Sequence, residues 1–435
     1  MTSITRRTVL KGLVAGAGLA LTGIDVARAA GAPAAPGSRP YPRLPAGVDT
    51  LPQVEHIVVL MMENHSFDNY FGMLGRGDGL TVAHDGRPRN ANPGPAGAVR
   101  SFHAASSCQA QVNISQSWDT SHQSWNAGRC DGFVNAKGVT PMAYFDGRDI
   151  PFYYSLARTF PICDRYFSSV MAQTYPNRRF LLAATALGQV GDPFPNVVSP
   201  QTPPNGTIFE MLSAHGISWK DYFVDLPTTG LFPSTVYSHP GQVVPVADFF
   251  VDAAAGTLPS VSLVDPESWQ GSEENPQDIH TGEYYASLII NAVLDSPVWD
   301  RTVLVLTYDE HGGYYDHVAP PRAVRPDSIR PEVPASRTYG DLYSYYGFRV
   351  PTVIVSPWAR RNYVSHVVHD HTSILKLIET KWNLPALTYR DANASNLLDS
   401  LDFRHRAFAE PPKLAPAPLP TGAVPCYLQH PSSPL

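Results

Sequence analysis

Residues 302–317 read TVLVLTYDEHGGYYDH. The first half is a run of β-branched and aliphatic residues without polar alternation, which is typical of a strand buried on both faces of a sheet. Asp309 and Glu310 follow directly, then a Gly-Gly pair and Asp316-His317. Ligands bind at the carboxyl ends of strands in open α/β sheets, and adjacent acids near a core need a cation or a proton to offset their repulsion. The stretch therefore predicts half of a metal or acid–base site, with a solvated Gly-Gly turn as the alternative.

A second buried strand is expected at His56–Met62, and it ends in Glu63-Asn64. A sheet that places the two strands side by side would bring these residues next to Asp309 and Glu310. The three carboxylates and the Asn64 amide form an all-oxygen set of ligands. Hard divalent cations such as Ca²⁺, Mg²⁺ or Mn²⁺ suit such ligands, so we predict a divalent metal bound by all four residues.

The rest of the chain alternates strands with helices, which predicts an α/β fold with a mostly parallel sheet. The 42 prolines indicate many long loops around these elements, above all at residues 73–115. Apolar patterns and helix start signals place further strands at 162–170, 217–223, 260–264 and 350–355 and helices at 152–158, 174–184, 206–215, 282–294 and 372–382.

Thr174 begins one of these helices, with Pro176 in the first turn. A hydroxyl at that position lies where helix amides favour an anion such as phosphate. Thr174 is therefore a candidate nucleophile, and metal coordination would lower the pKa of its hydroxyl. The alternative is that Thr174 only caps the helix.

Both ends of the chain differ in composition from the middle. Residues 1–29 contain a twin arginine, a short apolar run and a small-x-small cleavage pattern, which together predict a Tat-type signal peptide and a secreted or cell-envelope protein. Residues 30–53 indicate a flexible leader, residues 54–406 the main domain and residues 407–435 a Pro-rich irregular tail. The signal segment carries a net charge of +3, so the formal total of −6 becomes −9 without it. Such a charge argues against nucleic acid as a partner.

The four cysteines match no zinc pattern. Export permits disulfides, and Cys108 with Cys130 is the first pair to test, although four cysteines allow three pairings and free thiols are equally compatible.

Several motifs in order resemble the bacterial phospholipase C/acid phosphatase family. The segment 55–72, EHIVVLMMENHSFDNYFG, is similar to the opening motif of that family, and the Asp309-Glu310 stretch is similar to its second signature. Two later motifs also match, and the resemblance runs from about Glu55 to Glu379. The remaining matching segments are Trp125-Asn126, Asp131-Gly132-Phe133, Pro176-Asn177-Arg178, Val350-Pro351, Ser356-Pro357-Trp358 and residues 370–375.

The resemblance implies an alkaline-phosphatase-like α/β/α sandwich with a central mostly parallel sheet and long loop insertions. It also implies that Thr174 forms a covalent phospho-threonine, with Asn64 and Arg178 contacting the substrate. The expected substrate is a phospholipid or another phosphate ester, and a lipid substrate would bring transient contact with a membrane surface.

The sequence departs from the family at two positions associated with phosphoryl binding or proton donation. Gln116 stands where many members have His, and Asn275 stands where many have the His of His-Pro. Both side chains can donate hydrogen bonds to a substrate, but neither can act as a general acid. The nearest candidates for the catalytic acid are His122, His280 and His317, with His371 as a further one.

Three functions are consistent with these features. The leading prediction is an exported, metal-assisted phospholipase C that hydrolyses phosphodiester lipids. The first alternative is an acid phosphatase acting on monoesters. The second is a secreted binding protein with weakened catalysis, which Gln116 and Asn275 motivate and the intact Thr174 and acid set oppose.

Overall fold

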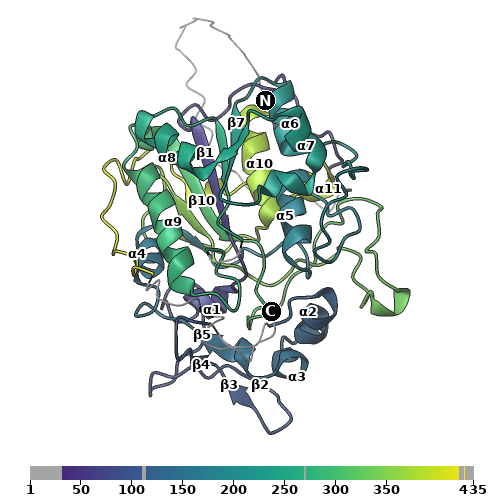
Figure 1. Ribbon diagram of the computed structural model, residues 1–435, viewed down its shortest axis with the longest axis vertical. Coiled ribbons are helices and arrows are strands. Elements are labelled where there is room, and N and C mark those ends of the chain that lie inside the picture. The colour runs from purple at the N-terminus through teal and green to yellow at the C-terminus, as the bar shows by residue number, and fades with distance from the viewer. Residues whose placement is uncertain (1–31, 110–113, 269–270, 421–425, 427–435) are drawn as a thin grey trace, which may run out of the picture. The chain divides into compact units, whose positions relative to one another are not determined.

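The computed structural model describes residues 32–109, 114–268, 271–420 and Cys426 (Figure 1). Its centre is one eight-stranded sheet. The strands lie in the order β12 (Val364–Ser365), β6 (Ile162–Cys163), β11 (Val353–Val355), β10 (Thr302–Tyr308), β1 (His56–Met62), β9 (Val261–Val264), β7 (Trp219–Phe223) and β8 (Val243–Pro245).

Most neighbours in this sheet run parallel, as predicted. β1 pairs in parallel with both β10 and β9, and β7 pairs in parallel with β9 and β8. The exception is β11, which is antiparallel to β10 and to β6. The expected strand at 162–170 is shorter than predicted, because the chain leaves the sheet after Cys163, where Asp164 accepts hydrogen bonds from other segments.

Helices cover both faces of the sheet. In Figure 1, α8 and α9 lie to one side of β1 and β10, and α5 and α10 lie to the other, so the fold is a layered α/β structure. The helices are α1 (Phe67–Phe71), α2 (Trp118–Trp125), α3 (Phe133–Lys137), α4 (Pro151–Thr159), α5 (Thr174–Ala183), α6 (Ile208–Ala214), α7 (Pro233–Ser238), α8 (Val246–Ala255), α9 (Ile279–Leu294), α10 (His371–Trp382) and α11 (Tyr389–Ala392).

The two central strands form the middle of the hydrophobic core. Every residue of β1 and of β10 is buried, as expected for strands covered on both faces. Leu60 and Val305 are fully inaccessible to solvent. Burying one such aliphatic side chain stabilises the fold by about 1.5–3 kcal/mol, so the strand pair holds the residues at its carboxyl end in fixed positions.

Loop insertions gather beyond the carboxyl ends of the central strands. They contain α1, α2 and α3 and two small sheets, which lie together at the bottom of Figure 1. The small sheets pair β2 (Ala91–Asn92) with β3 (Val99–Arg100) and β4 (Phe102–His103) with β5 (Ala143–Tyr144).

The expected flexible leader is tied to the end of α10 over much of its length. The Asn383 amide donates to the carbonyls of Tyr41, Leu44 and Pro45, and the Lys381 ammonium binds Asp49 at 2.8 Å. Composition alone predicted a flexible leader at residues 30–53, but residues 33–53 belong to the same compact unit as the main domain.

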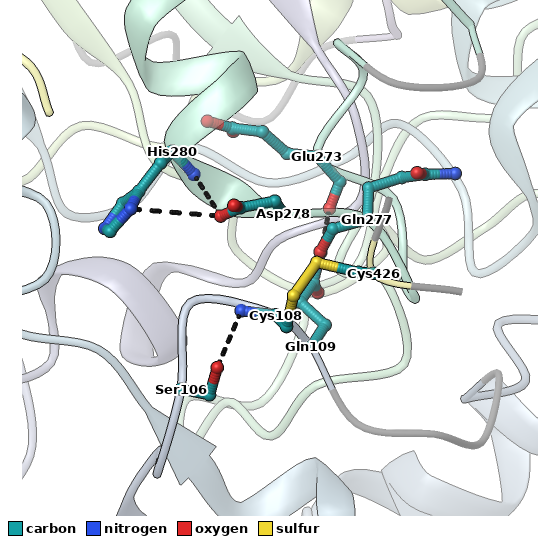
Figure 2. Close-up of a disulfide and its surroundings, with 8 residues drawn as sticks. All are labelled: Ser106, Cys108, Gln109, Glu273, Gln277, Asp278, His280 and Cys426. Carbon is teal, nitrogen blue, oxygen red and sulfur yellow. Dashed lines mark hydrogen bonds and ion pairs between the residues drawn. A yellow bond between two sulfur atoms is a disulfide. The ribbon is translucent and has the colours of Figure 1, made fainter. Parts of the chain in front are cut away.

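The disulfide joins Cys108 to Cys426, so the predicted pairing of Cys108 with Cys130 is wrong (Figure 2). Cys130 is buried in a small apolar cluster with Trp125 and Phe133, and Cys163 is buried in the main core, where both are free thiols. The pairing was not visible in the sequence because the two half-cystines are 318 residues apart and meet only when the tail returns to residue 108.

No helix in the described part of the chain is long and apolar enough to cross a membrane. The predicted signal peptide, residues 1–29, lies outside the described residues.

Candidate active site

The site forms where β1 and β10 end side by side. The parallel register pairs Met62 with Tyr308, so the acids that follow each strand leave the sheet at the same level. The backbone N–H of Asn64 donates to Asp309 Oδ1 at 3.1 Å, and the backbone N–H of Asp309 donates to the Met62 carbonyl at 3.1 Å. The two strand ends are therefore bonded to each other directly.

The turn after β10 requires glycine at position 312. Gly312 has a φ of 61°, and a Cβ there would lie 1.8 Å from the Asn64 carbonyl oxygen. Its amide donates to Glu310 Oε2 at 3.0 Å. The close approach of the two strand ends thus depends on the missing side chain.

Thr174 is the first residue of α5, and its side chain points at the end of β1. Its hydroxyl oxygen lies 3.3 Å from Glu63 Oε1 and 3.5 Å from Asn64 Oδ1. Asn177, one turn later, binds the loop before the helix through the Val170 amide and through the carbonyls of Ala172 and Gln173. This side chain therefore fixes the start of the helix and, with it, the hydroxyl.

Arg178 lies behind the acids and is almost fully buried. Its Nε donates to Asp309 Oδ2 at 3.1 Å, and its Nη1 donates to Thr228 Oγ1 at 3.0 Å and pairs with Asp265 at 3.5 Å. Burial opposes the charge of the guanidinium, but the Asp309 and Glu63 carboxylates raise its pKa above the usual value. The structure thus places this predicted substrate contact in an ion pair that holds Asp309.

Negative charge accumulates around Thr174. Burial, and next the Asp309 carboxylate, raise the pKa of Glu63 well above its ordinary value, and the same two causes raise the pKa of Glu310. Both effects reflect the cost of holding several carboxylates together away from water.

Two buried polar atoms in this set have no hydrogen-bond partner within the described residues, Asn64 Nδ2 and Glu310 Oε1. Orphaned polar atoms beside crowded carboxylates indicate a place for a polar or charged ligand. Oxygen ligands with several negative charges are the kind of ligands that bind a divalent cation.

Close clusters of potential metal ligands also occur elsewhere in the described residues. In three groups of His, Cys and acidic residues the ligand atoms lie within 4.8 Å of one another, and Glu63, Asp309 and Glu310 do not form such a group. One of the three contains the disulfide. The groups are Cys108, Asp278 and Cys426; Asp68, Asp316 and His317; and His103, Asp146 and Asp149.

Glu274 joins the site although sequence reasoning missed it. Gln116 Nε2 donates to Glu274 Oε1 at 3.2 Å. Burial, and next the Asp309 carboxylate, raise the pKa of Glu274 to about 7, while the hydrogen bond from Gln116 lowers it. The only signal in the sequence was its place directly before Asn275, whose amide donates to the Tyr314 hydroxyl at 3.3 Å.

The loop that carries Glu274 is anchored on both sides. The neighbouring Glu273 has a φ of 70°, and its buried carboxylate accepts hydrogen bonds from the hydroxyls of Tyr153 and Tyr308. Gln109, beside the disulfide, donates to the carbonyls of Glu273 and Gln277 (Figure 2). The disulfide-bearing segment therefore supports the loop that presents Glu274.

Lys137 is a second residue that sequence reasoning missed. Its ammonium lies 3.2 Å from His311 Nε2, and His311 Nδ1 lies 2.9 Å from Glu310 Oε2. Burial lowers the pKa of Lys137 to about 7, against the opposing effect of Glu310. No pattern in the sequence linked α3 to Glu310, because only the folding of the loops brings them together.

The three histidines expected to supply the proton do not join this cluster. His122 Nε2 pairs with Asp341 at 3.2 Å, and His280 Nε2 bonds the Asp149 carbonyl at 2.9 Å. His317 Nδ1 pairs with Asp68 at 2.6 Å. Across the described ranges, none of the three forms a hydrogen bond or an ion pair with Thr174, Glu63 or Asp309.

His317 belongs to a separate buried ion-pair network. Arg349 binds Asp68 at 3.1 Å and Asp316 at 2.9 Å, so a cation already lies between these acids. Although burial disfavours the charged ring, the Asp68 carboxylate raises the pKa of His317 to about 9. His371 comes nearer to the site, with Nε2 2.7 Å from the Asp309 carbonyl oxygen.

The chain belongs to the Phosphoesterase family, whose model matches residues 54–385. It is 32% identical over 402 residues to the non-hemolytic phospholipase C of Pseudomonas aeruginosa, covering 81% of this chain and 58% of that protein. It is 31% identical over 408 residues to phospholipase C A of Mycobacterium tuberculosis, covering 81% and 78%. The chain thus spans little more than half the length of the Pseudomonas protein.

Solved structures show a more distant likeness. A protein in the alkaline phosphatase superfamily from Vibrio parahaemolyticus matches with a TM-score of 0.42 and 12% identity, over 82% of this chain and 72% of that one.

Proposed function

We propose that the chain is a phospholipase C that hydrolyses the phosphodiester of a phospholipid with Thr174 as its nucleophile. The observation that carries the proposal is the position of the Thr174 hydroxyl. It lies at the start of α5 and faces the Glu63 carboxylate and the Asn64 amide at the end of β1. Membership of the Phosphoesterase family and similarity to phospholipases C support the reaction class.

In the first step, Thr174 Oγ1 attacks phosphorus and forms a phosphothreonine ester that keeps the headgroup. The bond from phosphorus to the diacylglycerol oxygen breaks, and the hydroxyl proton passes to Glu63 Oε1, the nearest acceptor at 3.3 Å. Asn64 Nδ2 supplies a donor for a phosphoryl oxygen, because it is buried and has no other partner within the described residues. Water then attacks phosphorus and the bond to Thr174 Oγ1 breaks, so that the phosphorylated headgroup is released. Glu63 returns its proton to Thr174 Oγ1, and the proton of the water passes to the group that protonated the diacylglycerol oxygen.

The departing alkoxide needs a proton, and we assign the role of proton donor to Glu274 in place of the expected histidines. With a pKa of about 7, about half of these carboxyl groups carry a proton at pH 7 and can supply it to the leaving oxygen. Its charged neighbours include Asp309, Asp192 and Arg178, and also Glu63 and Glu310. Gln116 then acts through Glu274 by fixing the orientation of the carboxyl group.

A divalent cation would be held by oxygens of Glu63, Asn64, Asp309 and Glu310. Its charge would offset the repulsion that raises the pKa of Glu63 and Glu310, and it would make the Thr174 hydroxyl more acidic.

We also propose that residues 1–29 direct export through the Tat pathway. The twin arginine and the cleavage pattern support this, as does the Cys108–Cys426 disulfide, because disulfides persist in oxidising compartments.

The test compares Thr174→Ala with Thr174→Ser on p-nitrophenylphosphorylcholine and on p-nitrophenyl phosphate. We expect the native protein to prefer the diester, the serine variant to keep measurable turnover and the alanine variant to lose at least about a thousandfold. A preference for the monoester would favour an acid phosphatase. Native rates in the alanine variant would overturn the assignment of the nucleophile.

A further inference from the structure

The segment 189–201 forms a closed loop on the helix that carries Thr174. At its base, Gln189 Nε2 donates to Gln201 Oε1 at 3.0 Å, and Arg179 of α5 donates to the same oxygen at 2.9 Å. Nearer the tip, Asp192 Oδ1 accepts a hydrogen bond from the Tyr175 amide at 2.7 Å. The loop is therefore attached to α5 at both levels, and one attachment is the residue next to Thr174.

The tip of this loop presents apolar side chains to solvent. Val198 is 91% exposed and Phe194 is 79% exposed, and they are the two most exposed large hydrophobic side chains of the described residues. Val197 between them is 59% exposed. Asn196 Oδ1 accepts hydrogen bonds from the amides of Val198 and Ser199, which holds the tip in a turn. Exposed apolar clusters of this kind mark interaction sites.

The tip of the loop contacts the start of α5, which carries Thr174. The Phe194 ring packs edge-on against Tyr175, with ring centroids 6.3 Å apart. A second exposed apolar pair, Val224 and Leu226, belongs to the loop after β7, in which Thr228 bonds Arg178. A surface that contacts these side chains would lie beside the start of α5.

We propose that residues 193–198 form a docking loop that inserts Phe194, Val197 and Val198 into the surface of a zwitterionic phospholipid bilayer. This inference rests on the proposed function, because the docked bilayer would supply the phospholipid that the site hydrolyses. Asp192 is the only charged residue between 189 and 201, so the tip has no cation to attract anionic lipid. The net charge of −6 opposes an anionic surface as well.

A second copy of the chain fits the tip less well than a bilayer does. The tip presents three apolar side chains, whereas a stable interface buries about 800 Å² per partner and involves about 20–30 residues a side. Insertion of a few apolar side chains into a lipid surface needs no such area, because affinity grows with each buried group.

The experiment uses the full chain and vesicles of pure phosphatidylcholine, with binding measured by flotation. The test variants are the double replacement Phe194→Ser with Val198→Ser and, separately, Val197→Glu. The matched control is Val251→Ser, which removes a valine that is 66% exposed on α8. Each variant is also assayed with soluble p-nitrophenylphosphorylcholine, and its fold is checked by thermal unfolding.

We expect both test variants to bind vesicles at least about tenfold more weakly, while the control binds like the native chain and the soluble substrate is turned over at the native rate. Absence of vesicle binding by the native chain, or equal binding by the test variants, would overturn the docking loop. So would a dimer that the double variant dissociates, or an equal loss of soluble turnover. If the native chain binds vesicles and the test variants bind them weakly, but the native chain does not hydrolyse p-nitrophenylphosphorylcholine, the docking loop stands and the proposed function fails.

Discussion

Replacing Glu274 by Gln tests the assignment of the proton donor. The carboxyl group has a pKa of about 7, raised by burial and by Asp309. At pH 7 about half of the molecules carry the proton on Glu274, and at pH 8 about a tenth do. With the ordinary value of 4.5 the protonated fraction at pH 7 would be only about 0.3%. The raised pKa therefore increases the supply of acid at neutral pH more than a hundredfold.

The assay compares a poor leaving group with a good one. Dihexanoylphosphatidylcholine releases an alkoxide that needs a proton, whereas p-nitrophenylphosphorylcholine releases a stable phenolate. For the native chain, kcat on the lipid should fall as the pH rises through about 7. Glu274→Gln should lower that kcat by a factor of about 10²–10⁴ and abolish the fall, while the nitrophenyl substrate loses much less.

Gln116→Ala serves as the matched control for this prediction. Removal of a donor to the ionised carboxyl group raises its pKa further, so the fall in kcat should move to higher pH rather than disappear. An unchanged pH profile in Glu274→Gln, or an equal loss on both substrates, would refute the role of Glu274 as the acid.

Two further predictions concern the strand ends and the ion-pair network. Gly312→Ala should reduce turnover strongly and destabilise the fold by more than about 1 kcal/mol, because the new methyl group meets the Asn64 carbonyl. Measurement of kcat tests the first effect and urea unfolding tests the second. Native turnover and native stability in this variant would contradict the close approach of the two strand ends. His317→Gln should destabilise the fold by up to about 3 kcal/mol below pH 6.5, measured by thermal unfolding. Since the folded pKa is raised, this contribution should be fully present below the unfolded pKa of about 6.5 and lost as the pH rises through about 9; a difference that grows toward alkaline pH would count against it.

The sequence was sufficient for the part of the fold that depends on continuous apolar runs. The strands at His56–Met62 and Thr302–Tyr308 have the predicted bounds, and their parallel pairing places Glu63 and Asp309 at neighbouring strand ends as expected. The direction of each strand in the sheet was harder to predict from the sequence. Val353–Val355 is as apolar as its neighbours but runs antiparallel, since hydrophobicity does not encode direction.

The second half of the site depends on loops, and the sequence contained little information about them. Glu273 and Glu274 are adjacent and chemically identical, yet one binds two tyrosines in the core and the other joins the acids near Thr174. Glu273 has a left-handed backbone conformation, and neither the glutamate itself nor its neighbours in the sequence signal that conformation. The histidines were chosen by chemical type alone, which could not show that Asp341 and Asp68 already bind two of them.

In the proposed mechanism, Thr174 becomes covalently bound to phosphorus during turnover. The most direct measurement is rapid acid quenching of the native chain with p-nitrophenylphosphorylcholine, followed by peptide mass spectrometry. The proposed mechanism predicts a phosphocholine adduct on the peptide that contains Thr174, which forms before steady state and is absent from Thr174→Ala. An adduct on another residue, or turnover by the alanine variant at the native rate, would contradict it.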